Sequence, residues 1–255
     1  MGLVTQNKCV PFLAAILLGL SPVLGAAELR VAVTANFFGT LQTLSALYGE
    51  ETGTQITLSS GASGALYTQI VNGAPFDVFF SADAVRPERL AEEGLGIPES
   101  RFTYAQGVLV LWSRREEVVD SAGEVLHSGD FRFLAMADPR TAPYGVAAQQ
   151  AMTHMGVWDE LNAQRQLVRG QGVGQTYQQV ASGAAELGFV ALAQVRDAEG
   201  RVPGSYWIPP QTGYDPIEQQ AIILTRTRER EAAERFMAWM RGPEARAVIE
   251  AAGYH

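Results

Sequence analysis

The sequence has 255 residues, 47% of them hydrophobic, which is enough chain to bury the core of one or two domains. It carries 27 acidic and 19 basic residues, and its formal net charge is −8. Because the chain is acidic and Lys8 is its only lysine, we expect neither a nucleic acid nor an anionic membrane surface as its partner.

Residues 1–27 have the pattern of a secretory signal peptide. Lys8 gives a positive start, Val10–Leu20 is an apolar run, and Gly25–Ala27 supplies the small residues of a cleavage site. The apolar run is too short for a membrane span. Cleavage would remove Lys8 and no acidic residue, so the net charge of −8 would become −9. It would also remove Cys9, the only cysteine, so we expect no disulfide and no thiolate site in the mature chain.

Strands and helices alternate in residues 28–94. The pattern predicts strands over 28–33, 55–58 and 77–81, and helices over 41–52, 65–72 and 82–94. The second strand and second helix are joined by Ser59–Gly64, a loop of small uncharged residues. This alternation is typical of a parallel sheet with helical crossovers.

A second α/β unit follows the apolar run Gly107–Ser113, which we interpret as a crossing between two lobes. The pattern predicts strands over 133–137, 166–168 and 187–191, helices over 146–155 and 175–182, a return strand over 221–225, and closing helices over 230–241 and 244–251. The predicted organisation is therefore a signal peptide (1–27), a first lobe (28–107 plus 220–255) and a second lobe (108–219).

Four loops share one pattern, in which a strand end is followed by small or neutral residues and then by a helix start. They are Thr34–Asn36, Ser60–Gly64, Ala142–Gly145 and Gly172–Gln175, two in each predicted unit. Ligands of open α/β sheets lie beyond the carboxyl ends of the strands, where helix N-termini meet. Free N–H groups at helix starts favour an anion. The sequence therefore predicts an anion site between the lobes that is built from neutral donors.

Rough magnitudes support such a site. A helix N-terminus favours an anion by about 0.3–1 kcal/mol when exposed and about 2 kcal/mol when partly buried. A charge-assisted hydrogen bond contributes about 1.5–3 kcal/mol. Micromolar to nanomolar affinity needs about 8–12 kcal/mol in total, so several fixed donors could hold a small dianion.

Several stretches carry a family resemblance. They are VAVTANF (31–37), SSGASG (59–64), IVNGAPFDVFFSAD (70–83), DPRTAPYG (138–145), GVGQ (172–175), ELGFVALAQ (186–194) and RGPEARAVIEAAGY (241–254). Over nearly the whole mature length, the chain resembles the periplasmic molybdate-binding proteins of bacterial ABC uptake systems. The NGAPFDVFFSAD stretch is the most specific of these in combination.

The resemblance implies a class II periplasmic binding protein fold, in which two α/β lobes, each a mixed sheet flanked by helices, close on a ligand in the cleft between them. It implies a periplasmic, monomeric protein that captures molybdate, and also tungstate, and delivers it to the membrane permease of an ABC transporter. Carried over by position, the ligand-binding residues would be Asn36, Ser63, Tyr144, Val173 through its backbone N–H, and Ala35. No catalysis and no cofactor are implied, and molybdenum would be present only as the bound oxyanion.

Three positions depart from the family pattern. Asn36 stands where many members have serine, and Ala191 stands where many have a tyrosine that touches the anion. Tyr144 occupies a position that is often alanine, so its hydroxyl could replace the missing one. These exchanges keep the anion class but leave the order among molybdate, tungstate and sulfate open.

Other functions find less support in the sequence. Binding of sulfate or another small oxyanion is the main alternative. Gly61–Ala65 is close to the G-x-S-x-G element of hydrolases, but Ala65 replaces the last glycine and none of the three histidines lies in a motif. A hydrolase is therefore a distant third interpretation, and a sensor domain is a further one, although the sequence shows no output domain.

Overall fold

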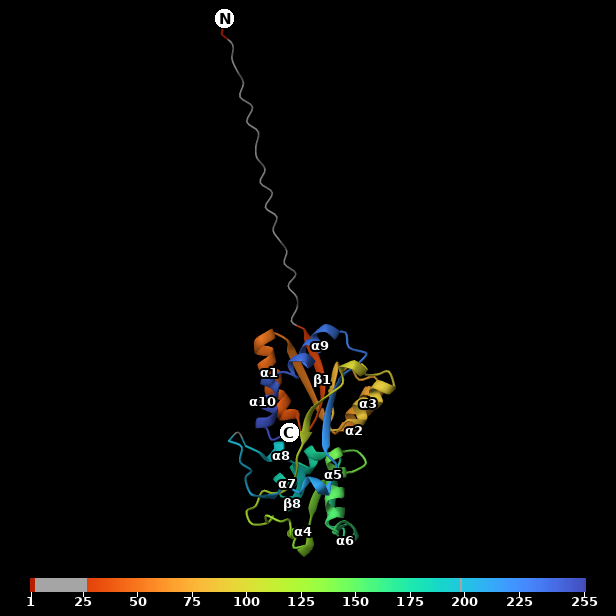
Figure 1. The fold of residues 1–255 in the computed structure, drawn as a ribbon, viewed down its shortest axis with the longest axis vertical. Coiled ribbons are helices and arrows are strands. Elements are labelled where there is room, and N and C mark those ends of the chain that lie inside the picture. The colour runs from red at the N-terminus through yellow and green to blue at the C-terminus, as the bar shows by residue number, and fades with distance from the viewer. Residues whose placement is uncertain (3–26, 198) are drawn as a thin grey trace.

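The computed structural model describes residues 1–2, 27–197 and 199–255. The predicted signal peptide lies outside these described residues, except for residues 1, 2 and 27. The remaining chain forms two lobes stacked along the long axis of the molecule (Figure 1).

Lobe 1 is built on a mixed sheet of five strands in the order β2-β1-β3-β10-β4. The strands are β1 (Glu28–Thr34), β2 (Gln55–Gly61), β3 (Val78–Phe80), β4 (Phe102–Gly107) and β10 (Ile217–Ile223). β1 pairs in parallel with β2 and β3, whereas β10 runs antiparallel to β3 and β4. The parallel pairs arise from the helical crossovers that the sequence predicts.

Lobe 2 repeats this plan in the order β7-β6-β8-β5-β9. Its strands are β5 (Leu109–Ser113), β6 (Leu134–Ala137), β7 (Leu167–Gly170), β8 (Leu187–Ala191) and β9 (Ser205–Trp207). β6 is parallel to β7 and β8, and β5 is antiparallel to β8 and β9. The predicted fold of two α/β lobes with mixed sheets is therefore confirmed.

Helices cover both sheets. In lobe 1 they are α1 (Phe38–Thr52), α2 (Ser63–Val71), α3 (Val85–Glu92), α9 (Arg230–Trp239), α10 (Pro243–Ala251) and the 3₁₀ turn η1 (Pro98–Ser100). In lobe 2 they are α4 (Val125–Ser128), α5 (Pro143–His154), α6 (Trp158–Ala163), α7 (Val173–Ala181) and α8 (Leu192–Val195). The 3₁₀ turn η2 (Gln211–Gly213) lies on the return path to lobe 1.

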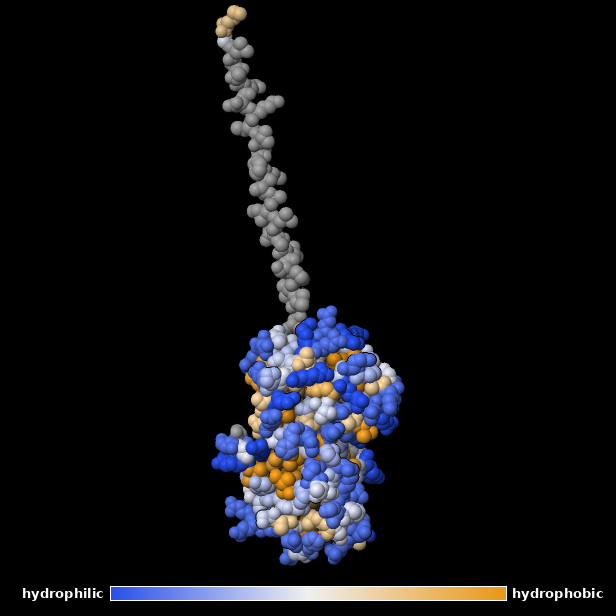
Figure 2. Space-filling model, viewed as in Figure 1, coloured by the Kyte–Doolittle hydropathy of each residue, from blue (hydrophilic) through white to orange (hydrophobic). Residues whose placement is uncertain are grey.

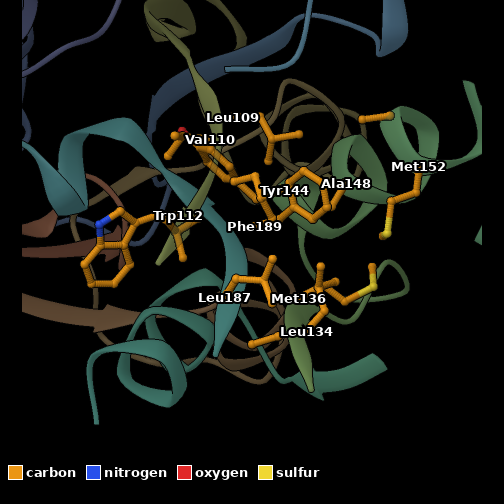
Figure 3. Close-up of a cluster of buried hydrophobic side chains, with 14 of the residues drawn as sticks. Leu109, Val110, Trp112, Leu134, Met136, Tyr144, Ala148, Met152, Leu187 and Phe189 are labelled. Atoms are coloured by element: carbon orange, nitrogen blue, oxygen red, sulfur yellow. The ribbon is translucent and has the colours of Figure 1, made fainter. Parts of the chain in front are cut away.

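The lobe 1 sheet is buried on both faces. Val31 and Val33 pack on the side of α1, α9 and α10, whereas Ala32 faces Leu66 of α2 and Leu90 of α3. Alternate residues of β1 thus enter different cores, which explains why this strand is apolar along most of its length. Lobe 2 has one continuous core around β5, β6 and β8 (Figure 3).

Two crossings join the lobes. The chain leaves the first sheet at Gly107 and enters the second at Leu109, so Val108 alone separates β4 from β5. It returns between β9 and β10. β10 begins at Ile217, whereas we expected the return strand at 221–225, so the predicted limit between residues 219 and 220 falls inside a strand. Glu218, Gln219 and Gln220 interrupt the apolar run and hide the start of the strand in the sequence.

Helix starts are the second point of difference. β2 continues through Ser59 and Ser60 to Gly61, so the predicted six-residue loop is reduced to Ala62. α2 then begins at Ser63, two residues before the predicted start, and α5 and α7 also begin earlier than expected. The loop residues thereby become the first turns of helices, where backbone N–H groups have no intrahelical partner.

Polar residues cover most of the face shown in Figure 2, with an apolar area on the lower lobe. Among the described residues, no helix is long and apolar enough to cross a membrane. Nor do the described histidine, cysteine and acidic residues form a group of three that could hold a metal ion.

Candidate functional site: a neutral cavity between the lobes

The four predicted loops meet at the junction of the two lobes. The carboxyl ends of β1 and β2 are neighbours, since Thr34 pairs with Gly61 in the sheet register. In lobe 2 the same relation holds for β6 and β7, where Ala137 pairs with Gly170. Each lobe therefore presents two adjacent strand ends, and each strand end leads into a helix or a turn that precedes one.

A small cavity of about 10 Å³ lies where these ends face each other. Its lining residues come from both lobes and are Thr34, Ala35, Asn36, Gly61, Ala62, Ser63, Ala82, Ala142, Pro143, Tyr144, Gly172 and Val173. All five predicted ligand-binding residues are among them. None of the lining residues carries a charge, so an anion here would meet only dipoles.

The backbone N–H groups of the predicted ligand-binding residues Asn36, Ser63, Tyr144 and Val173 have no protein acceptor in the described part of the chain. The same is true of the N–H groups of Ala62 and Gly172, which also line the cavity. Ser63 and Val173 are the first residues of α2 and α7, and Tyr144 is the second residue of α5, so their N–H groups extend from the helix starts. Ala35 differs, because its N–H already donates to the Gly61 carbonyl at 3.0 Å.

The Ser63 hydroxyl adds a further donor. Its oxygen accepts a hydrogen bond from the Ala82 N–H at 3.3 Å, and the side chain is almost completely buried. Among the described residues, the hydroxyl has no acceptor for its own proton. A hydroxyl held in this way can donate that proton into the cavity.

The Asn36 side chain donates its amide protons to other residues and not into the cavity. Its Nδ2 donates to Gln219 Oε1 at 2.8 Å and to the Tyr254 hydroxyl at 3.3 Å, so both amide protons have acceptors. The Tyr254 hydroxyl in turn donates to the Asn36 carbonyl at 2.7 Å. Asn36 is thereby held rigidly, and its backbone N–H is the donor that remains for the cavity.

The ring of Tyr144 anchors the second lobe's side of the site. It lies in the lobe 2 core beside Phe189 and Ala148 (Figure 3). Its hydroxyl accepts a hydrogen bond from Gln219 Nε2 at 3.3 Å, which is a contact that we did not expect. Burial raises the pKa of Tyr144 well above its ordinary value, and burial likewise raises the pKa of Tyr104 and Tyr254.

Asp138 shapes the turn before α5. Its carboxylate accepts the Arg140 N–H at 2.9 Å, and its carbonyl accepts the N–H groups of Thr141 and Ala142. The Arg140 guanidinium, which binds the carboxylate, lowers the pKa of Asp138 to about 2. Asp138 lies outside the cavity lining, so its charge orders the turn without facing the site.

The lobes touch each other around the cavity. The Gly64 N–H and Arg86 Nη2 of lobe 1 both donate to the Thr141 carbonyl of lobe 2, at 3.3 and 3.2 Å. Gly174 lies against Ala35, and a Cβ atom at Gly174 would be 2.7 Å from that of Ala35. The structure therefore describes the closed arrangement, and small residues permit it.

Two residues beside the site, Thr34 and Gln219, are not among the predicted ligand-binding residues, although Thr34 belongs to the predicted loop Thr34–Asn36. Thr34 lines the cavity, and its buried hydroxyl oxygen has no hydrogen-bond partner among the described residues. Gln219 links Asn36 to Tyr144. The strand-end pattern of the first loop marks Thr34, whereas no local pattern marks Gln219.

Known proteins resemble this chain over nearly its whole length. Residues 29–255 match the model of the bacterial extracellular solute-binding protein family. The molybdate-binding protein ModA of Azotobacter vinelandii is 44% identical over 229 residues, which are 90% of each chain. ModA of Rhodobacter capsulatus is 44% identical over 240 residues, which are 94% of this chain and 93% of that protein.

Solved structures also resemble this chain over most of its length. The periplasmic molybdate-binding protein of Azotobacter vinelandii matches with a TM-score of 0.88 and 51% identity, over 89% of this chain and 99% of that one. The sulfate-binding protein SubI from Mycobacterium tuberculosis matches with a TM-score of 0.74 over 89% of this chain and 86% of that one. At 14% identity, the second match shows a common fold alone. The chain belongs to the bacterial extracellular solute-binding protein family.

Proposed function

We propose that this protein captures molybdate outside the cytoplasm and delivers it to the permease of an ABC importer. The observation that carries the proposal is the convergence of four unpaired backbone N–H groups and the Ser63 hydroxyl on one cavity free of charged side chains. The two relatives that cover most of the chain at 44% identity are named molybdate-binding proteins.

The donor set suits a small tetrahedral dianion. Such an anion loses its hydration when it is buried, and fixed hydrogen-bond donors must replace the lost water. Charge-assisted hydrogen bonds contribute about 1.5–3 kcal/mol each, so five of them could offset this loss and leave a tight complex. Because lobe 1 supplies Asn36 and Ser63 while lobe 2 supplies Tyr144 and Val173, binding and lobe closure are coupled.

Further parts of the proposal follow the same chemistry. Tungstate has the same shape and charge, and we propose it as a second ligand. The protein acts as a monomer in the periplasm, has no resident cofactor and catalyses no reaction. The second candidate is sulfate, since it is also a small tetrahedral dianion, and the size of the closed cavity would decide between the anions.

Titration calorimetry of the purified protein with molybdate, tungstate and sulfate tests the proposal. We expect micromolar or tighter binding of molybdate and tungstate, with one anion per chain, and markedly weaker binding of sulfate. Preferential binding of sulfate would favour the second candidate. A protein that binds none of the three would contradict both.

Replacing Ser63 by alanine should weaken molybdate binding by about 10- to 100-fold, because one hydrogen bond to a charged group is lost. Ser60→Ala is the matched control, since Ser60 is exposed at the end of β2 and lies outside the cavity lining. Calorimetry should find its affinity within about twofold of the wild type. Equal affinities of the two variants would remove the Ser63 hydroxyl from the donor set.

Gly174→Ala should hinder closure. The added methyl would meet Ala35 across the cleft, so we expect weaker binding without a loss of stability in the free protein. Gly39→Ala is the control, because Gly39 is likewise the second residue of a helix and a Cβ atom there meets nothing within 4 Å. Calorimetry and thermal unfolding would be measured together. The idea fails if Gly174→Ala binds molybdate as the wild type does.

Affinity should be constant between pH 6 and 9. No charged side chain of the described residues lines the cavity, and burial raises the pKa values of Tyr104, Tyr144 and Tyr254 above their ordinary values. These tyrosines are neutral when protonated, so a raised pKa keeps them neutral throughout this range. Their ionisation at higher pH would place negative charge beside the anion and weaken binding. A tenfold change in the dissociation constant between pH 6 and 9 would contradict this account.

A further inference from the structure

A buried polar network connects the two lobes behind the cavity. Its centre is Gln219 of β10, whose side chain is fully buried. The pairing of β10 with β4 shifts register between Gln219 and Gln220, and Gly107 at the end of β4 leaves room for the amide. A Cβ atom at Gly107 would lie 2.6 Å from Gln219 Nε2 and would also clash with the Tyr144 hydroxyl.

The Tyr254 hydroxyl, at one end of this network, determines which atom donates in each of its hydrogen bonds. The Tyr254 hydroxyl donates its only proton to the backbone carbonyl of Asn36 at 2.7 Å. It can therefore only accept a hydrogen bond from the Asn36 side chain. Asn36 therefore presents Nδ2 to Tyr254, and the same Nδ2 donates to Gln219 Oε1 at 2.8 Å.

The orientation of the Gln219 amide follows. Its Oε1 accepts from Asn36 Nδ2 and lies 3.0 Å from the Tyr104 hydroxyl, so Nε2 must face the Tyr144 hydroxyl and donate to it at 3.3 Å. A flipped amide would set N–H groups against the Nδ2 protons of Asn36. The Gln219 side chain thus accepts a hydrogen bond from a donor in lobe 1 and donates one to an acceptor in lobe 2.

We propose that Gln219 is a positioning residue for anion binding. Asn36 and Tyr144 belong to different lobes, and each offers the cavity an unpaired backbone N–H. By holding both side chains, Gln219 sets the relative placement at which both N–H groups can reach one anion. This inference rests on the proposed oxyanion-binding function.

A purely structural role of Gln219 would have different consequences for the variants. If Gln219 only satisfied buried polar groups, its loss would lower the stability of the free protein and leave the affinity of the folded protein unchanged. A positioning role requires a loss of affinity. It also requires that the contributions of Gln219 and Tyr144 depend on each other, because they act through one hydrogen bond.

The experiment measures dissociation constants by calorimetry for Gln219→Met, Gln219→Glu, Tyr144→Phe and the double variant Gln219→Met/Tyr144→Phe. Gln220→Met is the matched control, since Gln220 is the next residue of β10 and its side chain, among the described residues, bonds only to Arg101 and Thr103 of lobe 1. Thermal unfolding without anion is recorded for each variant, so that stability and affinity are separated.

We expect Gln219→Met to weaken binding by about tenfold or more, and Gln219→Glu by more, because its carboxylate cannot donate to Tyr144 and brings a negative charge. The double variant should bind about as weakly as the weaker single variant, and Gln220→Met should stay within twofold of the wild type. Folded Gln219→Met protein with an affinity within twofold of the wild type would overturn the inference, and so would additive effects in the double variant.

The wild-type titration with molybdate tests the proposed function on its own. The ratio of variant to wild-type dissociation constants, measured with the tetrahedral oxyanion that the wild type binds, tests the role of Gln219. A wild type that prefers sulfate would therefore contradict the molybdate proposal, while the same set of variants would still decide this inference.

Discussion

Unpaired backbone N–H groups at the starts of helices are the feature on which the rest of this structure depends. Each such group needs an acceptor when water is excluded, and in the closed cavity none of these N–H groups bonds to an acceptor of the described chain. A buried anion needs donors for the same reason, because nothing else replaces its lost hydration. The two requirements complement each other. They explain why a chain with an acidic net charge can hold an anion in a cavity without a cationic side chain: the local dipoles are fixed and numerous, and the bulk charge lies outside.

The remaining architecture brings these donors together and keeps them in place. Parallel strands end side by side in each lobe, so two donor groups per lobe reach the same edge. Gly172 and Gly174 let the lobes approach, since a Cβ atom at either position would lie 2.8 or 2.7 Å from an alanine of lobe 1. Gln219 and Tyr254 bond to Asn36, and Tyr104 bonds to Gln219. The ring of Tyr144 is fixed in the lobe 2 core. Rigidity on both sides means that the donors are ordered before the anion arrives, which lowers the entropic cost of binding.

Much of the site could be predicted from the sequence because its parts are local. A strand end, a small-residue turn and a helix start lie within a few residues of one another, so Asn36, Ser63, Tyr144 and Val173 could each be located from their own segments. The exact helix starts could not, because Ser59–Gly61 pair with β1 as part of β2, and that pairing is a tertiary contact. The role of Gln219 could not be predicted, because it also depends on tertiary contacts. Gln219 lies 183 residues from Asn36 and 75 from Tyr144, and only the folded chain brings the three together. The short strand β9 and the polar start of β10 likewise have little pattern of their own.

The central claim is that one oxyanion is held by neutral donors from both lobes. A crystal structure of the protein grown with molybdate, with anomalous data collected at the molybdenum edge, tests it directly. We expect a single molybdenum peak inside the cavity, with anion oxygens at hydrogen-bond distance from the backbone nitrogens of Asn36, Ser63, Tyr144 and Val173 and from the Ser63 hydroxyl. A molybdenum peak outside this cavity, or an anion held by arginine side chains, would contradict it.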